Sequence, residues 1–326
     1  MSLFLSVITP IYNSASTLRD YLDALFESDY PRFESIIVDD QSADSGPDIL
    51  KSFPVSYHKL SHRMGSANAR NHGAGFAKGD ILVFIDPDVR VRSHTLKTIA
   101  ESFEQDPQIA GLICSYDDSP GGKRWVSQFK FLYHHYIHQQ QGRYVNLFWT
   151  GCSAVKKKVF DDLGGFDAHF FKDFNSINDI EFGYRLSVQK MKIFNAKHIQ
   201  VQHLKELSFL EWLITDFLRR GFPWVKIMKK YKNYSFNFNF SSPSSISACC
   251  AWLAMGSMVF SFFDFYFLLV TLGLWMVIFL ANYRAIQFFK KKKGPLFSIY
   301  SFFMLWIYYL NCGASFIAGL FFHSEA

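Results

Sequence analysis

The sequence predicts an α/β domain with a mostly parallel central sheet flanked by helices, followed by interfacial and transmembrane helices. Three observations predict it. Short apolar runs alternate with helical periodicity from the N-terminus to about residue 120. Acidic residues follow two of these runs, as they do at the carboxyl ends of strands in nucleotide-binding folds. Three long apolar stretches occupy the chain after residue 245.

The N-terminal 120 residues contain the expected strands of this sheet, at Phe4–Thr9, Phe33–Val38, Val55–Leu60 and Ile81–Ile85. The last of them is a short unbroken apolar run, which is typical of a parallel strand buried on both faces. Asn13 or Ser14 can cap a helix that places Leu18, Leu22, Leu25 and Phe26 on one face. Gly65–Ala77 is rich in small residues and compatible with a second helix.

Residues 121–245 are less regular. Helices are expected near Trp125–Gln141 and Asp179–Gln189, with a short strand near Ile199–Gln202. Phe209–Tyr231 mixes aromatic and basic side chains, so it predicts either a segment in the membrane interface or an ordinary helix pair packed on the domain. Asn233–Ser247 has the composition of a linker.

The last quarter of the chain is apolar enough for three transmembrane helices. Ile246–Phe263, Phe265–Ala281 and Leu296–Phe322 each approach or exceed the roughly 20 residues that cross a bilayer core. The first two would form a tight hairpin at Asp264; one long bent helix plus another is the alternative. Lys290–Lys293 lie between the second and third spans, and the positive-inside rule places this loop, and with it residues 1–240, in the cytoplasm.

Charge and cysteine content narrow the class of protein. The formal net charge of +6 is smaller than that expected of a nucleic-acid-binding protein. It fits an enzyme that handles anionic substrates near an anionic membrane. The five cysteines show no zinc-ligand spacing, so we expect reduced, structural thiols in a cytosolic domain. The first residues lead directly into a strand, and no signal peptide is expected.

Asp86-Pro-Asp88 is the strongest single motif. The strand Ile81–Ile85 delivers these two carboxylates to the edge of the sheet. Mg²⁺ and Mn²⁺ prefer oxygen ligands and are commonly held by one or two carboxylates plus substrate phosphate. The sequence therefore predicts a divalent-metal site with Asp88 as ligand and Asp86 toward a ribose, with turn capping as the alternative. Asp39-Asp40 ends the second strand and predicts either a base or ribose contact or a turn.

Several motifs occur together in the order and spacing of one family. They are Thr9-Pro-Ile-Tyr-Asn13, Val38-Asp-Asp-Gln-Ser-Ala-Asp44, Gly65-Ser-Ala-Asn-Ala-Arg-Asn71, Asp86-Pro-Asp88, Thr150-Gly151-Cys152, Gly164-Gly-Phe-Asp167, Asn178-Asp179-Ile-Glu181 and His203. Over about residues 3 to 205 the chain resembles the family-two inverting glycosyltransferases of the GT-A fold. The resemblance implies a catalytic domain at 1–205 with a nucleotide-sugar half (1–120) and an acceptor half (121–205). An interfacial segment and linker (206–245) and a membrane domain (246–326) would follow.

The resemblance implies a role for each matching residue. Pro10, Tyr12 and Asp39 would line the nucleobase pocket, and Arg70 would contact the nucleotide or its diphosphate. Asp86 and Asp88 would form the metal and ribose site. His203 would lie near the diphosphate, either as a metal ligand or as a structural histidine. Thr150, Gly151, Cys152 and Glu181 would lie on the acceptor side, with Glu181 in a supporting role.

Asp179 matches the general base of the family. In an inverting transfer, an acceptor hydroxyl attacks the anomeric carbon, a carboxylate removes its proton, and a metal and Arg70 offset the charge on the leaving diphosphate. An acid at a helix N-terminus is the alternative explanation for Asp179. Two departures bear on it: Asn178 replaces the usual first acid of the motif, and Phe170–Ile177 is slightly longer than usual.

The expected function is therefore transfer of a sugar from a nucleotide-sugar, with UDP preferred over GDP, in the presence of Mn²⁺ or Mg²⁺. Because the Gln-x-x-Arg-Trp motif of processive synthases is absent and Arg219–Trp224 is only a faint echo of it, we expect one sugar per acceptor. The acceptor would be a hydroxyl of a lipid-linked saccharide or glycolipid, with a polyprenyl phosphate as the alternative. A catalytically inactive membrane binding or assembly protein is the alternative of another class, and a transporter is disfavoured because the spans carry little charge.

Overall fold

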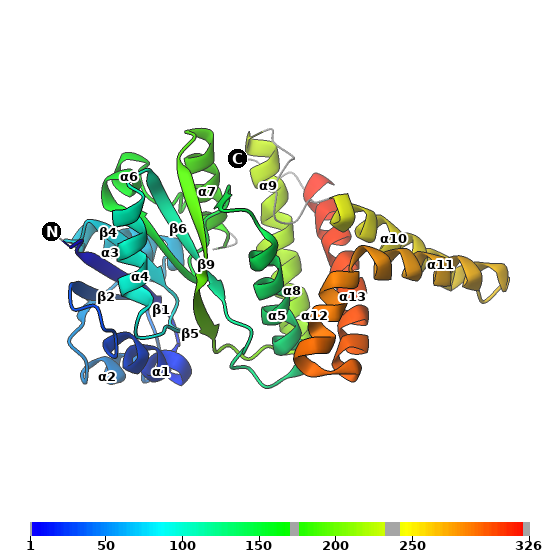
Figure 1. The fold of residues 1–326 in the computed structure, drawn as a ribbon, viewed down its shortest axis with the longest axis horizontal. Helices are drawn as coiled ribbons and strands as arrows, with labels where there is room; N and C mark the ends of the chain where they lie inside the picture. Colours follow the sequence, from blue (N-terminus) through cyan, green and yellow to red (C-terminus); the bar gives the residue numbers. More distant parts are fainter. Residues whose placement is uncertain (1, 170–175, 232–241, 322–326) are drawn as a thin grey trace. The chain divides into compact units, whose positions relative to one another are not determined.

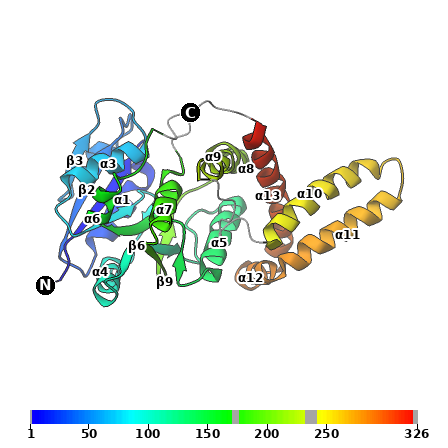
Figure 2. The ribbon, with the colours of Figure 1, turned by 90° about the horizontal axis from the view of Figure 1, so that it is seen from above.

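The computed structural model describes residues 2–169, 176–231 and 242–321 of the chain. The chain forms two compact units: residues 1–123 with 137–206, and residues 124–136 with 207–326. Helix α5 (Trp125–Gln140) begins in the second unit and ends in the first. Figures 1 and 2 show the strands in the first unit and the long C-terminal helices in the second.

The first unit is built on one large sheet, with strand order β3-β2-β1-β4-β8-β6-β9-β5 and β7 paired to β9. Its strands are β1 (Leu5–Ile11), β2 (Phe33–Asp39), β3 (Ser56–Lys59), β4 (Ile81–Ile85), β5 (Val89–Arg90), β6 (Ile109–Tyr116), β7 (Tyr144–Val145), β8 (Cys152–Lys156) and β9 (Lys192–His203). Strands β3, β2, β1 and β4 are mutually parallel, as are β6 and β9, whereas β8 runs antiparallel to β4 and β6. The predicted α/β class with a mostly parallel sheet is confirmed.

Helices join the strands of this unit. They are α1 (Ala15–Phe26), α2 (Gly46–Leu50), α3 (Ser66–Phe76), α4 (Thr95–Gln105), α6 (Lys157–Asp162) and α7 (Asn178–Val188). The expected face of α1 is buried, since Leu18, Leu22 and Leu25 are inaccessible. Helix α3 packs closely on β1 and β2, because a side chain at Gly73 would meet Ile8 and Val38. This close packing places Arg70, one turn earlier, toward the end of β4.

Strand β9 is the main departure from the expected elements of the first unit. Its 12 residues extend well beyond the predicted Ile199–Gln202, because it pairs with β5, β6 and β7. Exposed and half-buried polar side chains interrupt its apolar pattern, which hides the strand in the sequence. The predicted long segment Phe170–Ile177 lies mostly outside the described residues.

The second unit contains the remaining helices: α8 (Phe209–Asp216), the π-helix η1 (Phe217–Gly221), α9 (Phe222–Tyr231), α10 (Ser242–Phe260), α11 (Tyr266–Ala281), α12 (Tyr283–Lys293) and α13 (Pro295–Phe321). Trp212 and Trp224, from the predicted amphipathic segment, are buried in this unit, whereas Leu210, Ile214 and Leu218 form an exposed apolar row. The predicted linker lies largely outside the described residues, and its last part, Ser242–Ser247, begins α10.

Among the described helices, α13 is long and apolar enough to cross a membrane. Helices α11 and α12 pass the same test only together, and they are bent by 73° at Asn282. The apolar part of α10 is shorter. Three spans therefore remain a prediction. The loop expected at Lys290–Lys293 is instead the last turn of α12, because Ala285, Ile286 and Phe289 give that segment a buried helical face and its C-terminus favours positive charge.

Candidate active site

Backbone pairing brings three distant segments together at the carboxyl end of β4. Ile85 pairs with Cys152 of β8, and the Asp86 amide donates to the Gly151 carbonyl (3.3 Å). Val89 of β5 pairs with His203 at the end of β9, and the Leu204 amide donates to the Asp88 carbonyl (2.8 Å). The two aspartates of the motif therefore face different partners: Asp86 lies beside the Thr150–Cys152 segment and Asp88 beside His203.

Arg70 and Asp86 form a short ion pair, with Nη2 2.6 Å from Oδ1. The Arg70 side chain is 9% exposed and that of Asp86 30% exposed. Burial raises the pKa of Asp86, Arg70 opposes this rise, and the charges of Asp88 and Asp179 add to it. The structure thus brings three predicted site residues, Arg70, Asp88 and Asp179, within electrostatic reach of a fourth, Asp86.

Asp88 lies between His203 and Lys205. Burial raises the pKa of Asp88, and the positive charges of Lys205 and Arg70 oppose that rise. His203 Nε2 is 3.8 Å from Asp88 Oδ1, while its Nδ1 accepts the Lys205 amide (3.1 Å). A neutral imidazole that accepts at Nδ1 carries its proton on Nε2. Metal ligation through Nε2 would therefore require His203 to give up this arrangement, which favours the structural role.

Asp179 is held at the start of α7 by the loop before β8. Its Oδ2 accepts the Thr150 amide (3.0 Å) and the Thr150 hydroxyl (3.1 Å), and its Oδ1 accepts the Ile180 amide (2.9 Å). Ile177 precedes the helix with φ 48° and ψ 20°, a left-handed conformation that strains a β-branched residue. Strain of this kind concentrates at functional sites. Gly183 presses α7 against the Phe148 backbone, which fixes the position of the helix.

Glu181 points away from Asp179. It is fully buried and pairs with Arg185 (3.0 Å), whose guanidinium also donates to the Leu163 and Gly165 carbonyls (2.6 Å each). The pair thereby anchors the turn in which Gly164 and Gly165 adopt positive φ. Glu181 therefore has a supporting role, because it stabilises this turn and does not face Asp179.

Asp39 and Asp40 have different surroundings at the end of β2. Asp39 is fully buried, accepts the Ser42 amide and the Tyr57 hydroxyl (both 2.8 Å), and lies 3.9 Å from Lys59 Nζ. Burial and the bond to Asp39 raise the pKa of Tyr57 to about 12. Asp40 accepts the Met64 and Gly65 amides (2.6 and 2.9 Å) and so anchors the start of α3.

Tyr12 follows β1, in which Pro10 pairs with Val38 of β2. Its ring is 40% exposed, and the Arg63 guanidinium lies 3.9 Å from the ring centroid. Tyr12 and the guanidinium over its ring together form a partly exposed planar surface at this edge of the sheet, which is suited to stacking on a base. Arg63, like Tyr57, comes from a segment without a recognisable motif, so sequence reasoning missed both residues.

Cys152 and its neighbours complete the wall of the site. All five cysteines are free, and the buried Cys152 thiol lies 3.3 Å from that of Cys114. A side chain at Gly151 would lie 2.7 Å from the Tyr116 hydroxyl and 2.9 Å from the Trp149 ring, so the site requires glycine there. Trp149 adjoins the Thr-Gly-Cys motif and could have been noticed; Tyr116 and Lys205 carried no comparable signal.

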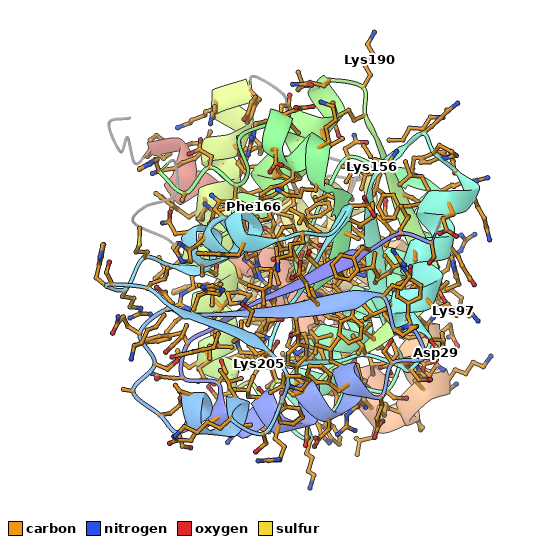
Figure 3. All side chains as sticks on the ribbon, turned by 90° about the vertical axis from the view of Figure 1, so that its left-hand side faces the viewer. Asp29, Lys97, Lys156, Phe166, Lys190 and Lys205 are labelled. Atoms are coloured by element: carbon orange, nitrogen blue, oxygen red, sulfur yellow. The ribbon has the colours of Figure 1, made fainter. Side chains whose placement is uncertain are left out.

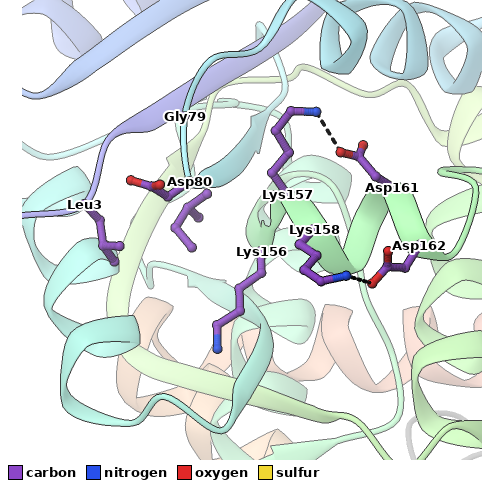
Figure 4. A pocket seen from close by; sticks show the side chains of 9 residues that line it. Leu3, Gly79, Asp80, Lys156, Lys157, Lys158, Asp161 and Asp162 are labelled. Atoms are coloured by element: carbon purple, nitrogen blue, oxygen red, sulfur yellow. Dashed lines mark hydrogen bonds and ion pairs between the residues drawn. The ribbon is translucent and has the colours of Figure 1, made fainter.

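An open pocket of about 540 Å³ lies elsewhere in the first unit. Leu3, Gly79 and Asp80 line it together with two ion pairs of α6, Lys157–Asp161 (2.8 Å) and Lys158–Asp162 (2.7 Å), shown in Figure 4. Lys156 of this pocket and Lys205 of the site are well separated in Figure 3. None of the site residues lines this pocket, so it is separate from the candidate active site. The lysine and aspartate charges that line it also neutralise each other.

Comparison with known proteins defines the class. The structure resembles that of the mannosyltransferase PcManGT from Pyrobaculum calidifontis in complex with GDP-Man and Mn²⁺ (TM-score 0.63, 15% identity, covering 97% of this chain and 88% of that one). It also resembles S. aureus TarS 1-349 in complex with UDP-GlcNAc (TM-score 0.51, 18% identity, covering 97% and 92%). The fold is that of the GT-A glycosyltransferases.

In the sequence comparison, residues 6–164 match the model of glycosyl transferase family 2. The chain is 30% identical over 128 residues to the glycosyltransferase GlyG of Streptococcus pneumoniae, covering 37% of this chain and 42% of that protein. It is 36% identical over 92 residues to AglE of Haloferax volcanii, covering 26% and 30%. The matches thus span less than half of these relatives. Residues 6–164 are thus similar to glycosyl transferase family 2, the family that the motifs resemble, and the fold is GT-A.

Proposed function

We propose that this protein transfers one sugar, with inversion, from a nucleotide-sugar to a hydroxyl of a membrane-associated acceptor. The observation that carries the proposal is the convergence of Arg70, Asp86, Asp88 and Asp179 at the carboxyl end of β4. These groups would bind and neutralise a leaving diphosphate and supply a base, which are the two requirements of a single displacement at an anomeric carbon.

The carboxylates of Asp86 and Asp88 are suited to binding a divalent cation. Asp86 and Asp88 repel each other's charge in a buried setting, which a cation would relieve. The described residues contain no group of three or more His, Cys, Asp or Glu side chains that could hold a metal alone. Substrate phosphate would complete the coordination of Mn²⁺ or Mg²⁺, as is common for Mg²⁺. When bound, the metal offsets charge on the departing diphosphate.

Arg70 supports donor binding in a second way. Its Nε is buried and has no hydrogen-bond partner among the described residues, although Nη2 binds Asp86. A buried donor without a partner is unusual and costs free energy. We assign Arg70 to the diphosphate and the partly exposed Tyr12 to the nucleobase; Pro10 and Asp39 are buried and would support that pocket from below, Asp39 through its bond to Tyr57. The two similar solved structures are complexes with GDP-Man and UDP-GlcNAc, which supports a nucleotide-sugar donor, and we propose a UDP-sugar in preference to a GDP-sugar.

Asp179 would act as the general base. The two bonds from Thr150 fix Oδ2 in one orientation, and acid–base catalysis depends on such positioning. A polyprenyl phosphate is already ionised at neutral pH and needs no base, so the oriented carboxylate supports a hydroxyl acceptor. The long apolar helix α13 supports a membrane location, with the catalytic domain on the cytoplasmic side as the charge of Lys290–Lys293 predicts.

Release of nucleoside diphosphate by the purified full-length protein tests this function. UDP-, GDP- and TDP-sugars would be supplied with Mn²⁺ or Mg²⁺, and membrane lipid extract would serve as the acceptor source. We expect metal-dependent release that the extract stimulates, and a loss of about 10²–10⁴-fold in stimulated turnover for Asp179→Asn. Unchanged turnover in D179N would favour the polyprenyl phosphate. Complete inactivity of the wild type with every donor would favour a binding or assembly protein.

A further inference from the structure

Two aromatic residues flank the centre of the site. The rings of Trp149 and Tyr116 meet edge to face, with centroids 4.5 Å apart at 86°. Tyr116 in turn contacts the His203 ring at 4.8 Å. Both rings cover Gly151, whose carbonyl accepts the Asp86 amide, and Trp149 directly precedes Thr150, which holds Asp179. Tyr116 and Trp149 therefore contact the segment that holds both Asp86 and Asp179, the proposed base.

The two rings differ in accessibility, as do Trp149 and its neighbour Phe148. Tyr116 and Phe148 are buried, and Phe148 is packed by Phe84 and Phe182 in the core. Trp149 is only half-buried. Tyr116 and His138, whose ring centroids lie 4.5 and 4.6 Å from that of Trp149, hold the indole in place; its Nε1 is buried, and Trp149 as a residue keeps part of its surface accessible.

A fixed, partly accessible indole beside a base suits one kind of molecule. Rigid aromatic side chains provide contact area at a low cost in conformational entropy. A pyranose ring carries C–H groups on one face, which can lie on an aromatic surface, and hydroxyls at its rim, which can donate hydrogen bonds to a carboxylate. A polyprenyl phosphate presents a phosphate anion at the reacting end and has no ring there to stack on the indole.

We propose that Trp149 is an acceptor-binding residue that stacks on the pyranose ring whose hydroxyl reaches Asp179, and that Tyr116 is its positioning residue. The acceptor is accordingly a saccharide, free or carried on a lipid. This inference rests on the proposed transferase function and names the acceptor chemistry of the same site. It assigns a role to a residue outside the sequence motifs.

The test compares full-length wild type with Trp149→Ala and Trp149→Phe in a detergent that contains no sugar. The control is Trp125→Ala, which removes a half-exposed tryptophan of the second unit that contacts Phe297 and Tyr300. Two rates of nucleoside diphosphate release are measured with a UDP-sugar and Mn²⁺. One is hydrolysis without acceptor. The other is release stimulated by methyl glucoside, methyl galactoside or methyl N-acetylglucosaminide, with sorbitol as the open-chain control.

We expect W149A to raise the KM for the stimulating glycoside by about tenfold, the effect of losing one well-placed aromatic contact. The loss in W149A should be larger in glycoside-stimulated release than in hydrolysis without acceptor, W149F should retain most of the affinity, and W125A should behave as the wild type in both rates. An unchanged glycoside KM in W149A overturns the proposal. So does a wild type that hydrolyses donor but responds to no glycoside. A wild type without hydrolysis or transfer removes the proposed function itself and this inference with it.

Discussion

Replacing Arg70 by methionine removes the cation that pairs with Asp86 while keeping an unbranched apolar side chain on α3. Loss of one partner from a buried ion pair typically costs about 3–5 kcal/mol, because a buried charge is left uncompensated. Asp86 retains 30% exposure and can be partly hydrated, so we place the loss at about 2–3 kcal/mol, below that range. For a domain of this size that lowers Tm by roughly 5–10 °C.

The same variant has a defined pH dependence. Burial raises the pKa of Asp86 in the folded chain, and Arg70 opposes the rise. Without Arg70 the folded-state pKa rises further above the unfolded value. The folded chain then binds the proton more tightly than the unfolded chain, so ionisation of Asp86 destabilises the fold as pH rises through this window. The loss of stability in R70M is therefore largest at pH 7.5 and smaller at pH 5.

Thermal unfolding of the purified full-length protein, followed by intrinsic fluorescence at both pH values, measures this effect. Arg90→Met is the matched control, since the Arg90–Asp20 pair (3.2 Å) has 46% and 55% exposed side chains and such pairs contribute about 0–1 kcal/mol. Arg70→Lys, which keeps the charge, should fall between wild type and R70M. Equal shifts in R70M and R90M, or a loss in R70M that does not change with pH, would refute the reasoning.

Three further predictions concern the support of the proposed base. Thr150→Val removes a hydroxyl bond that orients Asp179, so kcat of acceptor-stimulated release should fall by about tenfold, while Thr150→Ser stays near wild type. Equal rates in the two variants would contradict a positioning role for this hydroxyl. Glu181→Gln removes the buried negative charge that pairs with Arg185 and should lower the free energy of unfolding by about 2–3 kcal/mol, measured by thermal unfolding. An unchanged Tm would show that the Arg185 bonds to the Leu163 and Gly165 carbonyls are enough to hold the turn. Gly183→Ala forces a side chain onto the Phe148 backbone, so α7 must move and both Tm and kcat should fall. Gly75→Ala is the control, because Gly75 on α3 has open space around it, and this variant should be neutral or stabilising. Unchanged Tm and kcat in G183A would show that α7 tolerates displacement.

The sequence predicted the parts of the fold that are local. The apolar run Ile81–Ile85 and the acids after it identify a buried strand and its carboxyl end because both signals lie within one short segment. The amphipathic face of α1 is equally local. What depends on long-range pairing was not predictable: β9 was recognised over only part of its length, because its polar side chains interrupt the apolar pattern that identifies a strand.

The same distinction applies to the site. Asp86, Asp88, Arg70 and Asp179 each belong to a recognisable motif, whereas their mutual contacts arise from the pairing of β4 with β8 and of β5 with β9. Tyr116, at the end of β6, joins the site only through ring contacts with Trp149 and His203. In the C-terminal region the lysine run was expected in a loop, but one buried face makes it the end of α12.

Metal-dependent turnover of a nucleotide-sugar is the most direct test of the central claim, which is that Asp86, Asp88, Arg70 and Asp179 form one displacement site. Nucleoside diphosphate release by the purified full-length protein would be followed with and without Mn²⁺, beside Asp88→Asn and the pocket variant Lys158→Ala. We expect release that requires the metal, falls by about a hundredfold or more in D88N, and is unchanged in K158A. Release that is independent of metal, or equal in wild type and D88N, would contradict it.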